Sequence, residues 1–375
     1  MAAKKKQVLT KKQQKQIKKI AKKNPKVFII AVIVAIVVAG IGFGIYKFVQ
    51  SRKPKIESGE VQINFLELGN DKIGDSTFIK VGDIDILIDA GSTIDSVDAI
   101  ESFINTQVTD NKLEYVVATH AHKDHIGAFV GSTAKGSNGG ILDHYKVDNL
   151  IQFSQVAEET LLYQNFCTKV ENLKSQGTKV YDTATLIDEN KNVFELDENI
   201  TLTVLDQKYY HQKSSNENNH SVCTLLTQGN NNYLFTGDLE KAGEESLVES
   251  NPRLPHCQLF KGGHHGSITS SNECLLEKIS PEVVCMCTCC GTSEYQGDVT
   301  LFPNQVVLDR IGVYTDKIYC TGSIVNGEYK SLNGRITFIC KKGSDYYIEC
   351  TGEKEILRKT TWFSKNRVWN GIKSD

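Results

Sequence analysis

The chain has 375 residues, of which 40% are hydrophobic, 23% are charged and six are prolines. This composition excludes a disordered or collagen-like chain, and the length allows one large domain or two ordinary ones. The net charge of −2 is unevenly spread, because residues 1–26 carry eleven lysines and no acid, whereas residues 57–375 carry 28 Lys and Arg against 45 Asp and Glu. The charge of −17 on residues 57–375 argues against strong non-specific binding of nucleic acid, which needs clustered Lys and Arg.

Residues 27–46, VFIIAVIVAIVVAGIGFGIY, are uncharged and almost wholly apolar. As a helix they would be about 30 Å long, which matches the hydrocarbon core of a bilayer. A cleaved signal peptide would have a shorter apolar stretch. We therefore predict a basic tail at 1–26, one transmembrane anchor at 27–49 and a linker at 50–58. The lysines before the anchor predict a cytoplasmic N-terminus and an extracytoplasmic domain at 59–375, in the cell membrane.

After the linker, short β-rich runs alternate with segments of helical periodicity. The first half is predicted to hold strands at VQINFLEL, STFIKV and DILIDAG, a helix at SVDAIESFINTQV, a strand at LEYVVATH and a helix at AEETLLYQNFCTKVENL. Strands at ITLTVLD, VCTLLTQ and NYLFTGD and a helix at LEKAGEESLVE follow. This mixture predicts an α/β domain whose sheets are covered by helices.

Metal-ligating side chains are concentrated in THAHKDHIGA, residues 119–128. His120 and His122 follow an apolar strand, and extended residues two apart project to the same side, so both can reach one ion. Asp124 and His125, where the chain leaves the strand, can reach a second ion. Imidazole and carboxylate without thiolate suit zinc, manganese or iron. We therefore predict two divalent ions here, zinc or alternatively manganese.

This H-x-H-x-D-H pattern resembles the hallmark of the metallo-β-lactamase fold superfamily, which implies an αββα sandwich. The resemblance implies that Asp89, in DILIDAG, supports the metal loop from behind, and that Asp238, in LFTGDLE, bridges both ions. In KGGHHGSITSS, one of His264 and His265 would complete the second metal site. Adjacent residues on an extended chain face opposite ways, so the other would act as a general acid or hold substrate. We assign catalytic roles to Asp124, Asp238 and His265.

A closer resemblance is to the hydrolase-like domain of the DNA-uptake competence protein ComEC and its stand-alone relatives. GDS at 74–76, LIDAG, THAHKDHIG, NNHSVC, TGD and HHGS occur in the order typical of those chains, over roughly residues 61–340. The segment ELGNDKIGD is longer than the usual turn. In NNHSVC, His220 is either a third ligand of the first ion, as β-lactamases have, or a loop residue beside Asn218 and Asn219.

These features predict a membrane-anchored, extracytoplasmic, binuclear metal-dependent hydrolase of phosphodiesters, with DNA as the substrate that the ComEC resemblance implies. Divalent ions lower the pKa of a bound water to near neutrality and so supply a nucleophile. Two alternatives stay open. One is hydrolysis of a β-lactam, lactone or thioester at the same metals, and the other is a non-catalytic module of the envelope or of DNA uptake.

The eleven cysteines include one pair predicted to form a disulfide, Cys340 and Cys350, which flank the turn KKGSD. Four more in VVCMCTCC, residues 283–290, form either a zinc cluster or, as we predict, part of a buried strand in which cysteine acts as a small hydrophobe. The C-terminal TTWFSKNRVWNGIKSD is predicted to dock its aromatic residues onto the domain rather than to stack bases or touch lipid.

Overall fold

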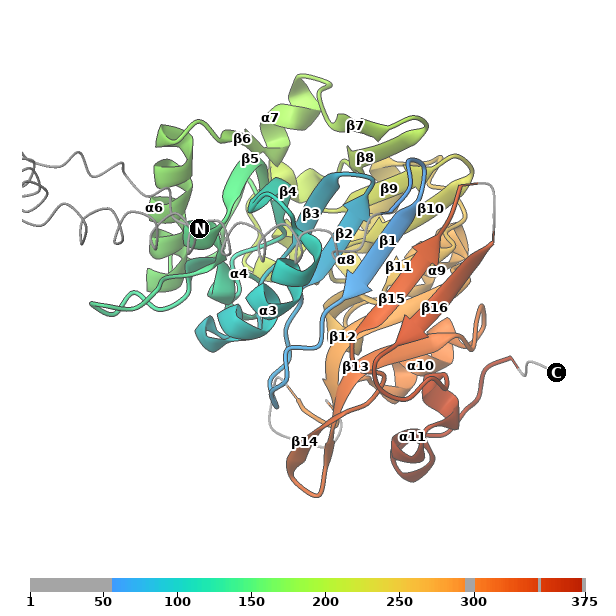
Figure 1. The fold of residues 1–375 in the computed structure, drawn as a ribbon. Coiled ribbons are helices and arrows are strands. Elements are labelled where there is room, and N and C mark those ends of the chain that lie inside the picture. Colours follow the sequence, from blue (N-terminus) through green and yellow to red (C-terminus); the bar gives the residue numbers. More distant parts are fainter. Residues whose placement is uncertain (1–55, 294–300, 343–344, 373–375) are drawn as a thin grey trace, which may run out of the picture.

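Two sheets of eight strands each form the centre of the protein in this computed structural model, which describes residues 56–293, 301–342 and 345–372 (Figure 1). The predicted tail, the anchor and residues 50–55 of the linker lie outside these ranges. Among the residues that are described, no helix has the length and apolarity needed to cross a bilayer. The mixed α/β domain predicted from the sequence is confirmed.

The first sheet joins strands from both ends of the described chain. Its strands lie in the order β16 (Tyr346–Cys350), β15 (Ile336–Cys340), β1 (Val61–Phe65), β2 (Thr77–Val81), β3 (Ile84–Ile88), β4 (Lys112–Ala118), β5 (Lys146–Gln152) and β6 (Lys179–Asp182). Strand β1 pairs antiparallel with both β2 and β15, whereas β3 to β6 run parallel. The carboxyl ends of β3 and β4 therefore lie at the same edge of this sheet.

The second sheet has the order β14 (Glu328–Ser331), β13 (Ile318–Val325), β12 (Val283–Cys290), β11 (Leu259–Lys261), β10 (Asn231–Phe235), β9 (Thr224–Gln228), β8 (Ile200–Val204) and β7 (Val193–Asp197). Strands β10 to β13 are parallel, and the strands on either side of them pair antiparallel. The carboxyl ends of β10 and β11 are thus also neighbours.

Helices cover the outer faces of both sheets. They are α3 (Val97–Gln107), α4 (Lys123–Val130), α5 (Ile141–His144), α6 (Leu161–Ser175), α7 (Thr183–Asp188), α8 (Lys241–Ser250), α9 (Glu273–Ile279), α10 (Gln305–Ile311) and α11 (Thr361–Asn366). One apolar core fills the space between the sheets and continues beneath α3, α4 and α6. A second core lies between the second sheet and α8, α9 and α10. The predicted order of layers, helix, sheet, sheet and helix, is therefore present (Figure 1).

Strand β12 explains the cysteine-rich stretch, because it is buried on both of its faces. Cys285 and Cys287 belong to the core between the sheets, whereas Met286 and Cys290 belong to the core on the helical side. Alternate side chains of a strand point to opposite faces, so this strand needs small apolar residues throughout. The prediction of a buried strand is confirmed, and its cysteines are free thiols.

The predicted disulfide between Cys340 and Cys350 is wrong, since neither residue is in a disulfide. Strands β15 and β16 do form a hairpin, but its register pairs Cys340 with Tyr346 and Cys350 with Ile336. Only residues equidistant from a turn face each other in an antiparallel pair. Cys340 is next to the turn and Cys350 is at the far end of its strand, so the two thiols are kept apart.

The C-terminal segment docks onto the domain as predicted. Trp362 and Phe363 are buried in the second core, and Trp369 packs against it. Arg367 fastens the segment further, because its Nε donates to the carbonyl of Pro303 at 2.9 Å. These aromatic rings therefore stabilise the fold instead of presenting a surface for base stacking.

Candidate metal centre

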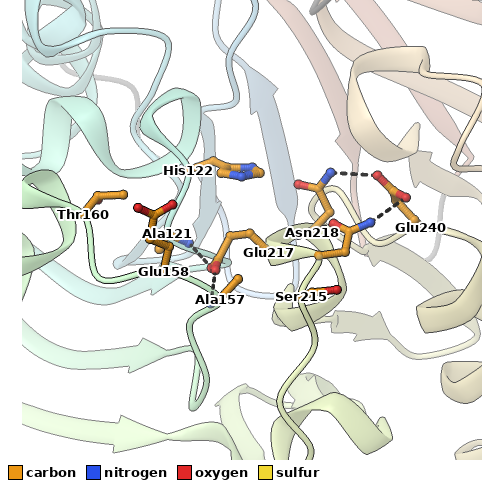
Figure 2. Close-up of a pocket in the computed structure, with 10 residues that line it drawn as sticks. Ala121, His122, Ala157, Glu158, Thr160, Ser215, Glu217, Asn218 and Glu240 are labelled. Carbon is orange, nitrogen blue, oxygen red and sulfur yellow. Dashed lines mark hydrogen bonds between the residues drawn. The ribbon is translucent and has the colours of Figure 1, made fainter.

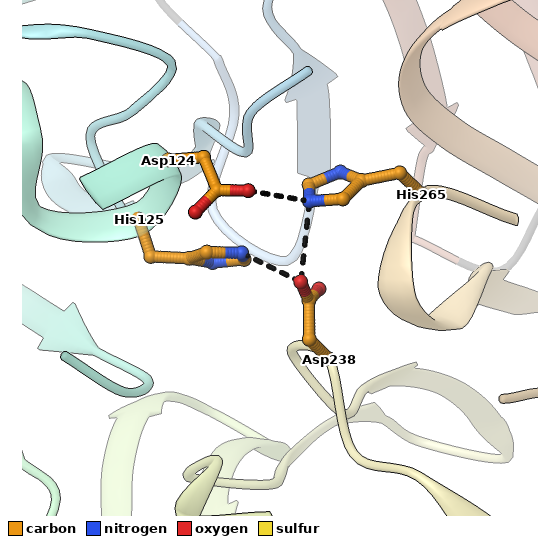
Figure 3. Close-up of side chains that lie close together, drawn as sticks. All are labelled: Asp124, His125, Asp238 and His265. Atoms are coloured by element: carbon orange, nitrogen blue, oxygen red, sulfur yellow. Dashed lines mark hydrogen bonds and ion pairs between the residues drawn. The ribbon is translucent and has the colours of Figure 1, made fainter. Parts of the chain in front are cut away.

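The candidate site lies where strands of both sheets end. Asp89 follows β3 and His120 follows β4, while Asp238 follows β10 and His265 follows β11. Figure 3 shows Asp124 and His125 facing Asp238 and His265 across a small space. Because each sheet supplies half of the side chains, the site requires the two sheets to be packed against each other.

Close backbone contacts between three short motifs fix the loops of the first sheet. The amide of Ala90 donates to the carbonyl of His125 at 2.8 Å, and the amide of Asp75 donates to the carbonyl of Asp124 at 3.0 Å. Gly91 is required for this approach, since a Cβ there would lie 1.6 Å from the carbonyl oxygen of Asp124. The glycine of LIDAG therefore lets the strand-end turn press against the histidine loop.

Asp124 and His125 are in the first turn of helix α4, with His122 as its N-cap residue. The sequence analysis placed them where the chain leaves a strand and did not predict this helix, which has only eight residues. The helical turn separates Asp124 and His125 from the extended residues His120 and His122. This separation favours the binding of two metal ions, one by each pair.

Four side chains form a group that can hold one metal ion: Asp124, His125, Asp238 and His265. Asp238 Oδ2 lies 2.9 Å from His125 Nε2 and 3.2 Å from His265 Nε2, and His265 Nε2 lies 3.3 Å from Asp124 Oδ2 (Figure 3). The ligand atoms of the group lie within 4.8 Å of one another. Asp238 Oδ1 and His265 Nε2 are buried without a hydrogen bond. Buried polar atoms are normally paired, so these two fit a cation between them.

A second pair of nitrogens lies beside this group. His120 Nε2 is 3.1 Å from His122 Nδ1, and the rings of His120 and His125 have centroids 4.1 Å apart. The other nitrogen of His120 faces hydroxyls, at 3.1 Å from Thr119 Oγ1 and 3.4 Å from Ser221 Oγ. His120 and His122 are therefore brought together as the spacing predicted, next to the four-residue group.

Asp89 lies behind His125 and fixes its ring. Its Oδ2 is 2.8 Å from His125 Nδ1, and its two oxygens accept hydrogen bonds from the amide and the hydroxyl of Thr119 at 2.8 and 2.7 Å. Asp89 has a φ of 58°, a left-handed conformation that Asp tolerates better than most residues. A carboxylate behind a ligating imidazole sets its tautomer and orientation.

The pKa shifts at the site follow from burial and from the charges that face each ring. Burial would lower the pKa of His125, but the carboxylates of Asp238 and Asp89 outweigh it and raise the pKa well above its usual value. Burial lowers the pKa of His120, and the neighbouring His125 and His122 lower it further. For Asp124, burial is opposed by His265 and His125, which bring its pKa down to about 2. Asp124 is thus ionised at neutral pH, the state in which a carboxylate ligates a cation.

His264 and His265 differ in their surroundings. Both lie in the 3-10 turn Gly263–Gly266 and have positive φ, 45° and 54°, so the extended chain assumed in the sequence analysis is absent. His265 belongs to the four-residue group. His264 has its Nδ1 3.0 Å from Thr269 Oγ1 and its Nε2 3.8 Å from Asp238 Oδ2. Of the two, His265 is the one that the fold brings to the other ligating side chains.

His220 is not brought to the other candidate ligands. It is fully buried in the 3-10 turn Glu217–His220, where its Nε2 accepts a hydrogen bond from the amide of Ser214 at 2.9 Å and its Nδ1 lies 3.5 Å from Glu217 Oε2. Both ring nitrogens are therefore directed at groups of their own loop. Ser221, the next residue, is the one that approaches His120.

Asp75 and Lys261 were missed as site residues by the sequence analysis. Lys261 is at the end of β11 and is 3% exposed. Its ammonium contacts Asp75 Oδ2 and lies 3.6 Å from Asp238 Oδ1. It also donates a hydrogen bond to the carbonyl of Gly237 at 3.0 Å. Asp75 Oδ1 in turn lies 3.2 Å from His265 Nδ1. The available signals were a lysine in the apolar strand LFK and the aspartate of the GDS turn, and neither had been given a role.

Glu244, on helix α8, was also missed. It is fully buried and accepts hydrogen bonds from the amides of Ser271 and Asn272 at 2.6 and 2.9 Å and from Asn272 Nδ2 at 2.7 Å. Burial raises its pKa to about 7, although these donors oppose the shift. Glu244 fixes the segment that follows His264 and His265, and nothing in its local sequence distinguishes it from the exposed Glu245.

Comparison with known proteins shows that the region holding this site matches a protein family. The family model described as Metallo-beta-lactamase superfamily matches residues 69–289. Recombination protein 2 of Haemophilus influenzae is 30% identical over 114 residues, which are 30% of this chain and 13% of that protein. ComE operon protein 3 of Bacillus subtilis is 23% identical over 232 residues, 60% of this chain and 26% of that protein. The matches thus span about a quarter or less of the length of these relatives.

Among solved structures, the metallo-beta-lactamase fold protein YhfI from Bacillus subtilis aligns with a TM-score of 0.40 and 11% sequence identity, over 73% of this chain and all of that one.

Proposed function

The chain belongs to the metallo-beta-lactamase superfamily, whose members are mostly metal-dependent hydrolases, and from this premise we propose that it hydrolyses phosphodiesters with two divalent metal ions. The observation that carries the proposal is the convergence of Asp124, His125, Asp238 and His265, in which two buried ligand atoms have no hydrogen bond, beside the pair His120 and His122. A carboxylate and imidazole set of this kind suits zinc or manganese.

The first ion would be held by His120 and His122, and the second by Asp124, His125 and His265, with Asp238 shared between them. When bound, such ions activate water and neutralise negative charge that develops on a phosphodiester. Asp89 orients His125, and the carbonyl of Cys287, 2.9 Å from His265 Nδ1, orients His265 with Asp75 beside the same nitrogen, so that each imidazole presents one fixed nitrogen to the centre. No side chain of the group needs to become covalently attached to the substrate.

A proton for the leaving alkoxide is best held by His264. It is the remaining histidine at the centre, with its Nε2 3.8 Å from Asp238 Oδ2, and it is not part of the four-residue group. This reverses the catalytic role first assigned to His265, because an imidazole whose nitrogen ligates a cation cannot also carry a proton there.

Two facts support phosphodiesters over the carboxyl-type alternatives. The relatives of this chain include proteins named for recombination and competence, which favours a phosphodiester such as DNA. The alternative of β-lactam hydrolysis relied on His220 as a third histidine at the first ion, and both nitrogens of His220 are directed elsewhere.

The test is hydrolysis of bis-p-nitrophenyl phosphate by the full-length chain loaded with zinc or with manganese, combined with metal analysis. We expect turnover with about two ions per chain and a loss of at least about a thousandfold in kcat for Asp124→Ala. The matched control is His256→Ala, which removes an exposed histidine paired with Glu282. Bound metal without phosphodiester turnover would refute the proposal and favour carboxyl-type substrates, and absence of bound metal would favour a non-catalytic module.

We also propose a location: an anchor at 27–49 tethers the domain to the extracytoplasmic side of the cell membrane. The support is the apolar run and the lysines before it. Resistance of the protein to alkaline extraction from membranes, and protease access to the domain in intact cells, would test the anchor and its orientation separately.

A further inference from the structure

A cavity of about 690 Å³ opens beside the candidate metal centre, with His122 in its wall (Figure 2). This volume is in the range of small-molecule sites. Because His122 is shared, a substrate whose phosphodiester lies at the metals could extend into the cavity. The lining residues are Ala121, His122, Ala157, Glu158, Thr160, Ser215, Asn216, Glu217, Asn218 and Glu240.

The wall of this cavity is negative. Glu158, Glu217 and Glu240 contribute carboxylates, and neither lysine nor arginine is among the lining residues. A concave surface lined by charges of one sign concentrates its field inside the cavity. A chain of further phosphates, as in a nucleic acid, would be repelled there, whereas a cation would be attracted.

Neutral donors hold two of these carboxylates, so their charge is fixed in place without a full counter-charge. Glu217, 8% exposed, accepts from the amides of Ala121 and Ala157 at 2.9 and 2.5 Å. Glu240 accepts from the side-chain amides of Asn216 and Asn218 at 2.8 and 2.9 Å (Figure 2). Histidine nitrogens lie farther off, at 3.5 Å from Glu217 and 3.7 Å from Glu240.

An independent observation indicates a ligand that donates hydrogen bonds. Asn218 is 4% exposed and its Nδ2 is directed at Glu240, but its Oδ1 is buried without a hydrogen bond. An unpaired buried acceptor costs about 1–3 kcal/mol unless a donor reaches it. A donor entering the cavity would satisfy this oxygen at the same wall that carries the carboxylates.

We propose that the cavity binds a primary ammonium group on the alcohol that the phosphodiester retains, so that the preferred substrate is an aminoalkyl phosphodiester. This class matches both features, because its nitrogen carries a positive charge and three hydrogen-bond donors. A neutral polyol would leave the carboxylates of the cavity without a counter-charge. This inference rests on the proposed function and names its substrate class.

The experiment compares two esters with the same leaving group, 2-aminoethyl 4-nitrophenyl phosphate and propyl 4-nitrophenyl phosphate, with the full-length, metal-loaded chain. The two differ only by an ammonium in place of a methyl group. We expect kcat/KM to be about fivefold higher for the aminoethyl ester, since one exposed charge pair contributes about a factor of five. The preference shrinks in high salt, because the cavity is open to solvent.

Glu158→Gln separates the effect of the cavity from the intrinsic reactivity of the esters. Glu158 is exposed and lines the cavity, and the neighbouring Glu159 is exposed but does not line it. We expect Glu158→Gln to lower the aminoethyl to propyl ratio about threefold with the propyl ester unaffected, and Glu159→Gln to leave the ratio unchanged.

Equal kcat/KM for the two esters, or a ratio that Glu158→Gln does not alter, would overturn the ammonium site and leave the phosphodiesterase proposal intact. Faster hydrolysis of thymidine 5′-(4-nitrophenyl) phosphate than of the aminoethyl ester would also overturn it, in favour of a nucleic-acid substrate. Hydrolysis of none of these esters would contradict the proposed function itself, and the ammonium site with it.

Discussion

The two histidines of the four-residue group are supported from behind in different ways. Behind His125, Asp89 is held by the amide and hydroxyl of Thr119, which are neutral. Behind His265, Asp75 is held by the ammonium of Lys261. Burial raises the pKa of Asp89, with its ion pair to His125 only partly opposing it. For Asp75 burial acts in the same direction, but Lys261 and His265 outweigh it and lower the pKa.

This difference shows that one arrangement, a carboxylate behind an imidazole, can be built with or without a compensating charge. The neutral version depends on hydrogen bonds that a strand end supplies. The charged version brings an additional cation to within 3.6 Å of Asp238, the carboxylate proposed to bridge the metals. The half of the site on the second sheet therefore depends on one lysine, and the half on the first sheet does not.

Lys261→Met gives the largest expected effect. It leaves Asp75 buried without its cation, and breaking a buried ion pair by removing one partner costs about 3–5 kcal/mol. Urea denaturation in the presence of a chelator measures the loss. Lys278→Met, at an exposed position of α9, is the control and should change the free energy of unfolding by less than about 0.5 kcal/mol. A similar small change for Lys261→Met would show that the charged support is dispensable.

Glu244 tests the neutral type of support at a second place, because its oxygens accept only from N–H groups of neutral residues. Its pKa rises from 4.5 to about 7 on folding. The folded state then holds a proton that the unfolded state has lost, so the free energy of unfolding falls as pH rises through this window, by up to about 3 kcal/mol.

The measurement is the difference in the free energy of unfolding between pH 5 and pH 7.5, in chelator, for wild type and for Glu244→Gln. We expect the glutamine variant to lose most of this pH dependence. Glu245→Gln, at the neighbouring exposed position, should keep it. Equal pH dependence in wild type and Glu244→Gln would mean that Glu244 is ionised at pH 5 in the folded protein.

Asp89→Asn and Asp75→Asn compare the two supports directly. Asp89→Asn should weaken metal binding by about 10–100-fold, because His125 loses the carboxylate that orients it. Asp75→Asn should weaken it less, because the carbonyl of Cys287 still accepts a hydrogen bond from His265 Nδ1. Asparagine tolerates the left-handed backbone at position 89, but its amide nitrogen would face a buried donor, so Asp89→Asn should lower the stability of the metal-free protein by about 1–3 kcal/mol, less than Asp75→Asn does. Asp75→Asn should lower it more, since Lys261 loses its partner. Zinc competition and urea denaturation give both quantities, and equal stabilities would remove the distinction between the supports.

The sequence predicted about half of the strands and the residues that end them, because apolar alternation and turn residues are local signals. It identified His120, His122, Asp124 and His125 for the same reason, as four ligands in six residues. Contacts between segments that are far apart in the sequence could not be predicted from these local signals. Lys261 became a site residue only when strands β10 and β11 paired and placed it behind Asp238.

Two errors came from assuming an extended backbone or a favourable register. The turn at Gly263–Gly266 has left-handed residues, which spacing alone does not reveal. Cys340 and Cys350 belong to a real hairpin, but Cys340 is next to its turn and pairs with Tyr346, whereas Cys350 is at the far end of the hairpin and pairs with Ile336. His220 resembled a ligand through its neighbours in sequence, whereas its Nε2 accepts a hydrogen bond from the amide of Ser214 and its Nδ1 lies beside Glu217 of the same loop.

The strand order of the first sheet has a consequence for synthesis. Strand β1 is among the first parts of the domain to leave the ribosome, yet one of its two partners, β15, comes about 275 residues later, at Ile336–Cys340. Until then β1 presents an open edge, and open edges of apolar strands invite pairing with other chains. A nascent chain is thus exposed to misassembly for almost the whole of its translation. Truncations that end before residue 336 are expected to aggregate, which can be measured as loss of soluble protein.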